Sequence, residues 1–183
     1  MKLTVIALLT LSLTTAACKK KDEAAGPPAA KPVEPGAKPT EPAPPPAPVE
    51  TKMVPLDLAA VGEEWAGWSV MAPEGATVKE SFGNAQISMG GSFQVDLGKG
   101  EADVASFKKE VDGNDVNKVK RYLVDQPDAI LYESEVMGQT EFHLFGAVKV
   151  GEDTFSCEDV KGPPHTQAEV ETMWKICQSI TKK

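Results

Sequence analysis

The sequence predicts an α+β domain over residues 53–183, in which helices cover a largely antiparallel sheet. Three observations point to this fold class. Several short segments alternate apolar and polar residues with the period of a strand. Two other segments repeat apolar residues with the period of a helix. Along the chain the order is strands, one helix, a run of strands and a final helix, which favours helices packed on an antiparallel sheet.

The expected strands are short and are separated by turn residues. Gly90 and Gly91 predict a bulge or turn, and Gly151-Glu152-Asp153 predicts the tip of a hairpin. The strand segments are residues 68–72, 76–82, 85–89, 93–97, 120–125, 129–136, 142–150 and 154–160.

Two segments have helical spacing. Val104, Phe107 and Val111 lie at i, i+3 and i+7, and Gly113 is a plausible C-terminal stop. The last helix has the clearer signal, because Thr166 and Glu169 match a capping box at its start. The apolar stripe of this helix consists of Val170, Met173, Trp174, Cys177 and Ile180.

Residues 1–17 have the features of an export signal. Lys2 gives the leader a positive charge, and Leu3 to Leu13 form an apolar run well below the roughly 20 residues that span a bilayer. The stretch from Leu13 to Cys18 resembles a lipobox, the signal for attachment of diacylglycerol to a cysteine and cleavage just before it. Ala16 and Ala17 match that pattern, whereas Thr15 stands where leucine is usual.

The resemblance implies a bacterial lipoprotein anchored to a membrane through a lipid on Cys18. Plain secretion after cleavage behind Ala17 is the alternative. Lys19 follows the cysteine where an aspartate would favour retention in the inner membrane, so the resemblance implies the outer membrane, with the protein facing the periplasm or the exterior.

Residues 18–52 are expected to form a disordered tether rich in Pro and Ala. Ten of the chain's 15 prolines lie between Pro27 and Pro48, and large apolar side chains are nearly absent. Such a segment favours extended polyproline II and acts as a spacer, or alternatively as a recognition segment for a proline-binding groove.

The predicted domain is strongly acidic. Residues 53–183 carry 12 Lys and Arg against 22 Asp and Glu, a net charge of −10, whereas the whole chain carries −8. This charge argues against nucleic acid as a partner, because phosphates would be repelled. No nucleotide, metal or cofactor motif stands out in the sequence.

A second resemblance concerns the domain itself. The run Trp68-Ser69-Val70-Met71-Ala72-Pro73-Glu74-Gly75-Ala76 resembles the opening strand and turn of the PsbP-like α/β/α sandwiches, and the order of elements agrees over most of residues 66–181. That resemblance implies an accessory or binding protein without a shared catalytic centre.

Cys157 and Cys177 are expected to form a disulfide. Cys157 shares a strand face with Phe155, and Cys177 lies on the apolar stripe of the last helix, so both point into one core layer. Export places them in an oxidising compartment. The rival interpretations are two buried free thiols or a redox pair, although no Cys-x-x-Cys spacing supports the redox pair.

The remaining candidates are aromatic and imidazole side chains. Of Trp65 and Trp68, one is expected in the core, and the other is a possible partner contact. His143 is expected on a sheet with its tip in water, and His165 in an exposed loop, far apart from each other.

These observations predict a non-catalytic binding or accessory domain with a protein or envelope component as its partner. The alternative is a hydrolase of the envelope that uses carboxylates alone. Two carboxylates converging in a cleft with raised pKa would favour the enzyme, and an exposed aromatic patch would favour binding.

Overall fold

The computed structural model describes residues 51–183. The predicted signal peptide (1–17), the lipidation site Cys18 and all of the tether except residues 51 and 52 lie outside the described residues.

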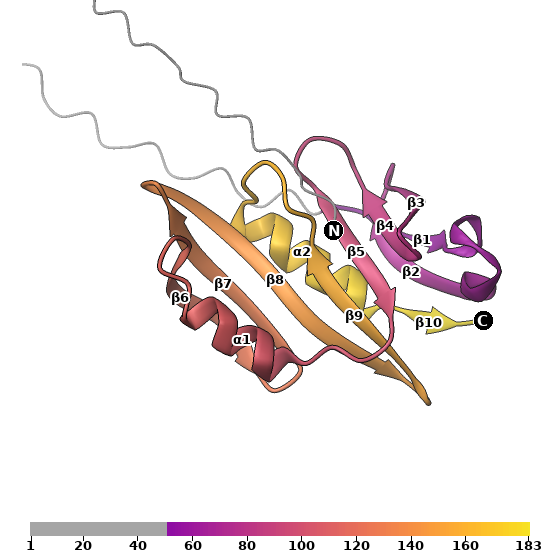
Figure 1. Cartoon of the computed structure of the whole chain (residues 1–183). Helices are drawn as coiled ribbons and strands as arrows, with labels where there is room; N and C mark the ends of the chain where they lie inside the picture. Colours follow the sequence, from indigo (N-terminus) through magenta and orange to yellow (C-terminus); the bar gives the residue numbers. More distant parts are fainter. Residues whose placement is uncertain (1–50) are drawn as a thin grey trace, which may run out of the picture. The chain divides into compact units, whose positions relative to one another are not determined.

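Strands dominate the described part of the chain and form two antiparallel sheets (Figure 1). The large sheet has seven strands in the order β3-β4-β5-β9-β8-β7-β6, and the small sheet has the order β1-β2-β10. The bounds are β1 Met53–Asp57, β2 Trp68–Pro73, β3 Thr77–Ser81, β4 Asn84–Ser88, β5 Gln94–Lys99, β6 Lys118–Gln126, β7 Ala129–Val136, β8 Gln139–Val150, β9 Asp153–Asp159 and β10 Thr181–Lys182.

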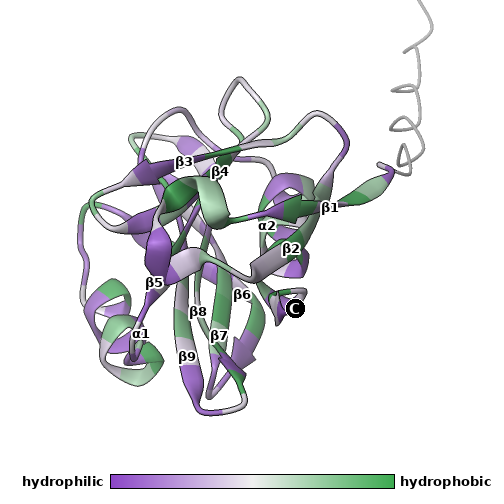
Figure 2. Ribbon diagram, turned by 90° about the vertical axis from the view of Figure 1, so that its right-hand side faces the viewer, coloured by the Kyte–Doolittle hydropathy of each residue, from purple (hydrophilic) through white to green (hydrophobic). Residues whose placement is uncertain are grey.

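The two α-helices, α1 (Val104–Asp112) and α2 (Gln167–Gln178), pack on opposite faces of the large sheet (Figure 1). Adjacent residues of β7 show this division: Ile130 packs in the cluster that contains Val104 of α1, and Leu131 packs in the cluster that contains α2. Both helices alternate hydrophobic and hydrophilic stripes, as expected for helices with one face on a sheet (Figure 2). The predicted α+β class with a largely antiparallel sheet is therefore confirmed.

The larger core lies between α2, the large sheet and the small sheet. Two short 3-10 helices, η1 (Ala59–Val61) and η2 (Glu63–Trp65), connect β1 to β2. Trp65 and Trp68 are both buried there, with ring centroids 5.9 and 4.7 Å from that of Phe155. The prediction that one of these tryptophans is exposed as a partner contact is wrong, because η2 turns Trp65 inward beside Trp68.

A disulfide joins α2 to β9 inside this core. Cys157 and Cys177 are both fully buried, and their Cα atoms lie 6.2 Å apart. The predicted pairing is confirmed, and it ties the last helix to a central strand of the large sheet.

Trp174 also fixes α2 on the sheet, at a position where β8 has no side chain. A Cβ atom on Gly146 would lie 2.7 Å from the Trp174 ring and 3.3 Å from Ala129 Cβ. Because contacts below 3 Å are strongly repulsive, only glycine fits at this point of β8 without moving the helix.

The start of α2 has the capping geometry that the sequence predicts. The Thr166 hydroxyl accepts a hydrogen bond from the Glu169 backbone N–H, and the Glu169 carboxylate accepts one from the Thr166 backbone N–H. These bonds satisfy donors that the first turn of a helix leaves unpaired. The helix therefore begins directly after the loop of residues 160–165, which lines the site described next.

Candidate functional site

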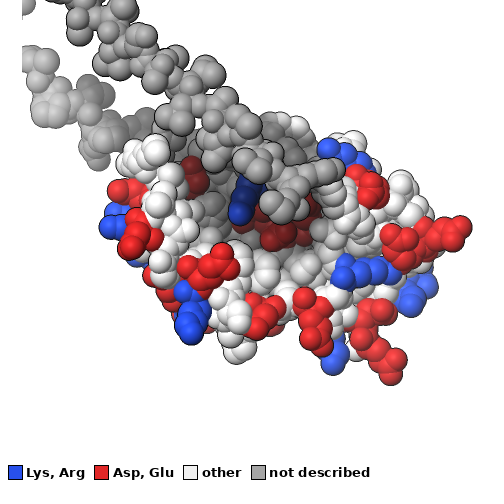
Figure 3. Space-filling view, in the orientation of Figure 1, with Lys and Arg blue, Asp and Glu red and all other residues white. Residues whose placement is uncertain are grey.

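A cavity of about 320 Å³ lies between α1, strands β7 to β9 and the loop of residues 160–165. Carboxylates, amides and imidazoles line it together with the aromatic rings of Phe107 and Tyr132. On the side of the molecule that carries α1, acidic side chains gather at the base of a hollow (Figure 3). The volume is at the lower end of the range of about 300–1,000 Å³ for ligand pockets.

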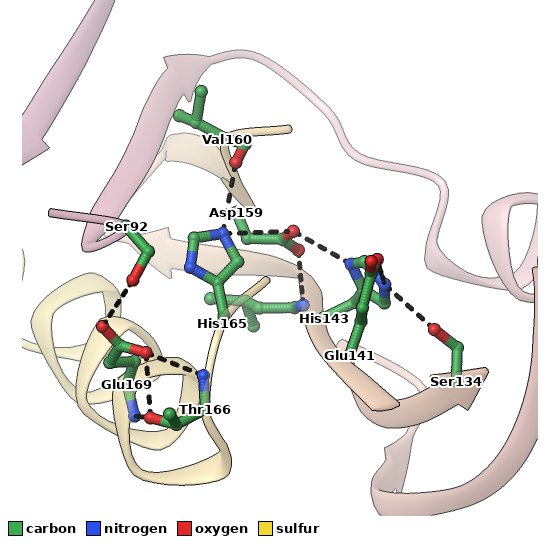
Figure 4. A network of polar contacts seen from close by, with 10 residues as sticks. Ser92, Ser134, Glu141, His143, Asp159, Val160, His165, Thr166 and Glu169 are labelled. Carbon is green, nitrogen blue, oxygen red and sulfur yellow. Dashed lines mark hydrogen bonds and ion pairs between the residues drawn. The ribbon is translucent and has the colours of Figure 1, made fainter. Parts of the chain in front are cut away.

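Asp159, the last residue of β9, is the centre of a polar network at the cavity wall (Figure 4). One carboxylate oxygen accepts a hydrogen bond from the backbone N–H of Leu144 at 2.6 Å. The other lies 3.1 Å from His143 Nδ1 and 3.8 Å from His165 Nε2. The Asp159 side chain is only 8 % exposed, so these contacts replace the water that a buried carboxylate loses.

The contacts of His143 fix its tautomer. A carboxylate oxygen can only accept, so Nδ1 donates to Asp159. In the neutral ring Nε2 then accepts from the Ser134 hydroxyl at 3.1 Å. The Glu141 carboxylate lies 3.7 Å from the same Nε2, and the Tyr132 ring packs at a centroid distance of 5.0 Å. The prediction that the tip of His143 lies in water is therefore wrong.

Asp159, His143 and Ser134 follow the order of a serine-hydrolase triad, with the acid on Nδ1 and the hydroxyl on Nε2. Unlike the nucleophile of such a triad, however, the Ser134 hydroxyl is not accessible to a substrate. Ser134 is fully buried within β7 and is not part of the cavity lining. A nucleophile must touch its substrate, so this arrangement holds the imidazole in place rather than attacking a carbonyl group.

His165 lies in the same network, although 22 residues separate it from His143 in the sequence. Its side chain is only 3 % exposed, and Nε2 lies 3.2 Å from the carbonyl oxygen of Val160. The prediction that His165 is exposed and far from His143 is wrong, because the chain between Val160 and α2 folds back over the end of β9. Periodicity in the sequence contains no signal for this loop closure.

A pair of neighbouring carboxylates, separate from the network around Asp159, lies beside the cavity. Asp96 of β5 and Glu158 of β9 are cross-strand partners, with Gln86 of β4 next in the same row. Burial raises the pKa of Asp96, whose Oδ1 is buried without a hydrogen-bond partner. Burial also raises the pKa of Glu158, and the charges of Asp96 and Asp159 raise it further.

Within residues 51–183, no three His, Cys, Asp or Glu side chains are grouped closely enough to hold a metal ion. None of the helices described there combines the length and the apolar character required to cross a bilayer.

Comparisons of this chain with protein-family models, with curated proteins and with solved structures find no match. The chemistry of the cavity and of the neighbouring carboxylates is therefore the basis for a functional assignment.

Proposed function

We propose that this chain is a lipoprotein of the bacterial cell envelope whose domain binds a partner without catalysis, and that the cavity between α1 and β9 is its binding site. The observation that carries the proposal is the cavity itself. It combines aromatic walls with polar groups that the fold holds in fixed positions, as binding pockets do.

The anchor in this proposal is the lipid on Cys18, supported by the resemblance of residues 13–18 to a lipobox. The tether of residues 18–52 keeps the domain near the membrane and raises its effective concentration for partners there. The lysine after Cys18 supports the outer membrane as the location, with the domain facing the periplasm or the exterior.

The arrangement of the helices supports the finer fold assignment, a PsbP-like sandwich. One helix covers each face of a central antiparallel sheet, as the resemblance implies. That family consists mostly of accessory and binding proteins, which agrees with a binding role, although a fold alone does not fix a function.

Site-directed photocrosslinking tests the binding site in native membranes. A photoreactive amino acid replaces Asn114, an exposed residue that lines the cavity, and as a control Glu152 at the exposed tip of the β8–β9 hairpin. We expect a discrete adduct from position 114 and none from position 152. The same adduct pattern from both positions, or no adduct at 114, would reject the cavity as the binding site.

A carboxylate-based envelope hydrolase is the second candidate, and one observation favours it. Asp96 and Glu158 are adjacent, both have raised pKa values, and Glu158 lines the cavity. Such pairs supply the acid and the base of glycoside hydrolysis.

Release of reducing ends from isolated cell-wall polysaccharide tests the hydrolase. If Asp96→Asn and Glu158→Gln each abolish a measurable activity that Glu152→Gln retains, the chain is an enzyme and the binding proposal fails. No release of reducing ends by the wild-type chain leaves binding as the function.

A further inference from the structure

The cavity has more hydrogen-bond acceptors than donors, and this excess indicates the chemistry of its ligand. Carboxylates of Glu110, Glu141, Glu158 and Asp159 belong to its lining, whereas Lys161 is the only Lys or Arg side chain in that lining. Lys161 is solvent-exposed and forms no ion pair among those found in residues 51–183. The surplus of negative charge favours a cationic ligand.

Two residues of the lining, Asn117 and His165, each have a buried acceptor without a donor. Asn117 Oδ1 is buried without a hydrogen-bond partner. His165 Nε2 faces the carbonyl oxygen of Val160, which can only accept, so Nε2 carries the proton. In the neutral ring Nδ1 is then an acceptor, and it too is buried without a partner. Buried polar atoms of this kind normally have a partner. A ligand in the cavity could supply one to Asn117, whereas His165 Nδ1 lies on the side of the ring away from Asp159, toward the start of α2 (Figure 4).

Exposed apolar side chains lie at the end of the sheet next to the cavity. Val116, between the lining residues Asn114 and Asn117, is 72 % exposed, and Met137 at the β7–β8 turn is 95 % exposed. Val116 precedes β6 and Met137 follows β7, at the end of the sheet where Lys118 pairs with Glu135. We call Val116 and Met137 the apolar rim.

The turn at Met137 adds a second indication. Met137 has a φ of 51°, in the left-handed region that bulky side chains rarely adopt. Asn or Asp is the usual residue at such a turn position. The exposed Met137 side chain is therefore available for contact with a partner.

We propose that the cavity binds the ammonium or guanidinium group of a lysine or arginine side chain, presented by a protein partner whose flanking apolar residues contact the apolar rim. This inference rests on the proposed binding function and specifies its ligand. A basic side chain supplies the donor that Asn117 lacks, and its charge is stabilised by the surrounding carboxylates. The rings of Phe107 and Tyr132 offer additional cation–π contacts.

A basic peptide is favoured over a free amine and over a membrane surface. The apolar rim has no role in binding a small amine. Anionic lipid headgroups would be repelled by a domain with a net charge of −10 over residues 53–183.

Calorimetric titration of the intact chain in detergent micelles tests the ligand class. The probe is an acetylated and amidated peptide with one arginine between two leucines, and the control peptide carries citrulline, which is neutral and of similar shape. We expect the arginine peptide to bind about tenfold more tightly, the size of one charge-assisted hydrogen bond or more. Equal affinity for the two peptides would overturn the proposal.

Three variants locate the binding. Glu158→Gln removes a carboxylate outside the Asp159 network and is expected to lower the affinity for the arginine peptide several-fold. Glu152→Gln is expected to leave this affinity unchanged. Lys161→Gln removes the competing cation and is expected to tighten binding. Unchanged affinity in Glu158→Gln would place the peptide elsewhere and reject the site.

Met137→Ser distinguishes a peptide from a free amine. We expect this variant to bind the arginine peptide more weakly. Its affinity for agmatine, an amine that carries the same guanidinium without flanking residues, should not change. An equal effect on both would remove the apolar rim from the proposal and leave a small-amine site. If position 114 gives a photocrosslinked partner but the arginine peptide does not bind, the ligand class is wrong and the binding function stands.

Discussion

Loss of the Cys157–Cys177 disulfide is expected to cause a large fall in stability. The perturbation is Cys157→Ala, Cys177→Ala or both, in a chain that also carries Cys18→Ser so that no other thiol remains. Both cysteines are fully buried, and alanine places no new polar group in the core. The main change is therefore the loss of the cross-link between β9 and α2.

The magnitude follows from the sequence separation of 20 residues. Closing a loop of that length lowers the entropy of the unfolded chain by an amount worth about 3 kcal/mol at 25 °C. The unfolding entropy of a domain of about 130 residues is on the order of 270 cal/mol/K near its melting temperature. Dividing the two gives a fall in Tm of about 11 °C, and the double variant should match the single ones because all three lose the same bond.

Differential scanning calorimetry with and without reductant measures the effect, and thiol counting on the unfolded, non-reduced protein measures the bond itself. The reduced Cys18→Ser chain is the matched control and should melt near the alanine variants. A fall in Tm below about 3 °C, or two free thiols in protein isolated from the envelope, would refute the reasoning.

Four further outcomes are expected. Because burial raises the pKa of Asp96, its charged form destabilises the fold at neutral pH. Asp96→Asn should therefore raise the Tm at pH 8. This gain in Tm should vanish as the pH falls below 3.8, the ordinary pKa of an aspartate. Thr166→Ala removes the cap of α2 and should lower the free energy of unfolding, measured in urea, by about 1 kcal/mol. Thr166→Ser keeps the capping hydroxyl and should retain most of that stability. A palmitate analogue should label the wild type but not Cys18→Ala; equal labelling would exclude this lipid site. Limited proteolysis should cut within residues 22–52 and leave a core starting near residue 53, unless that segment packs on the domain.

Local patterns in the sequence predict most elements of the fold. The strand at 129–136 has the bounds expected from alternation, and Thr166 caps the final helix as the capping box predicts. Strands β1 and β10 are absent from the prediction because each is short and partly polar, and each depends on pairing with β2. Their formation is a tertiary effect that periodicity cannot encode.

The candidate site was less predictable because its contacts are non-local. The β7–β8 register places His143 next to Ser134 and Tyr132, and the end of β9 brings in Asp159. Alternation can place His143 on one face of a strand but cannot say what covers that face. The pairing of Cys157 with Cys177 was predictable because both lie on apolar faces of their elements and because the expected compartment is oxidising.

If the proposed lipid on Cys18 holds the chain by its N-terminus, the small sheet has a mechanical consequence. The predicted tether ends directly before β1, an edge strand whose only partner in the sheet is β2. A pull on that segment therefore acts first on the contacts of Lys52 with Glu74 and then on the pair Met53–Pro73. It peels β1 from β2, while β10 stays paired on the other edge. The seven-stranded sheet and the cavity lie beyond this strand. Under load, separation of β1 from β2 would lengthen the extended N-terminal segment and leave the proposed binding site folded.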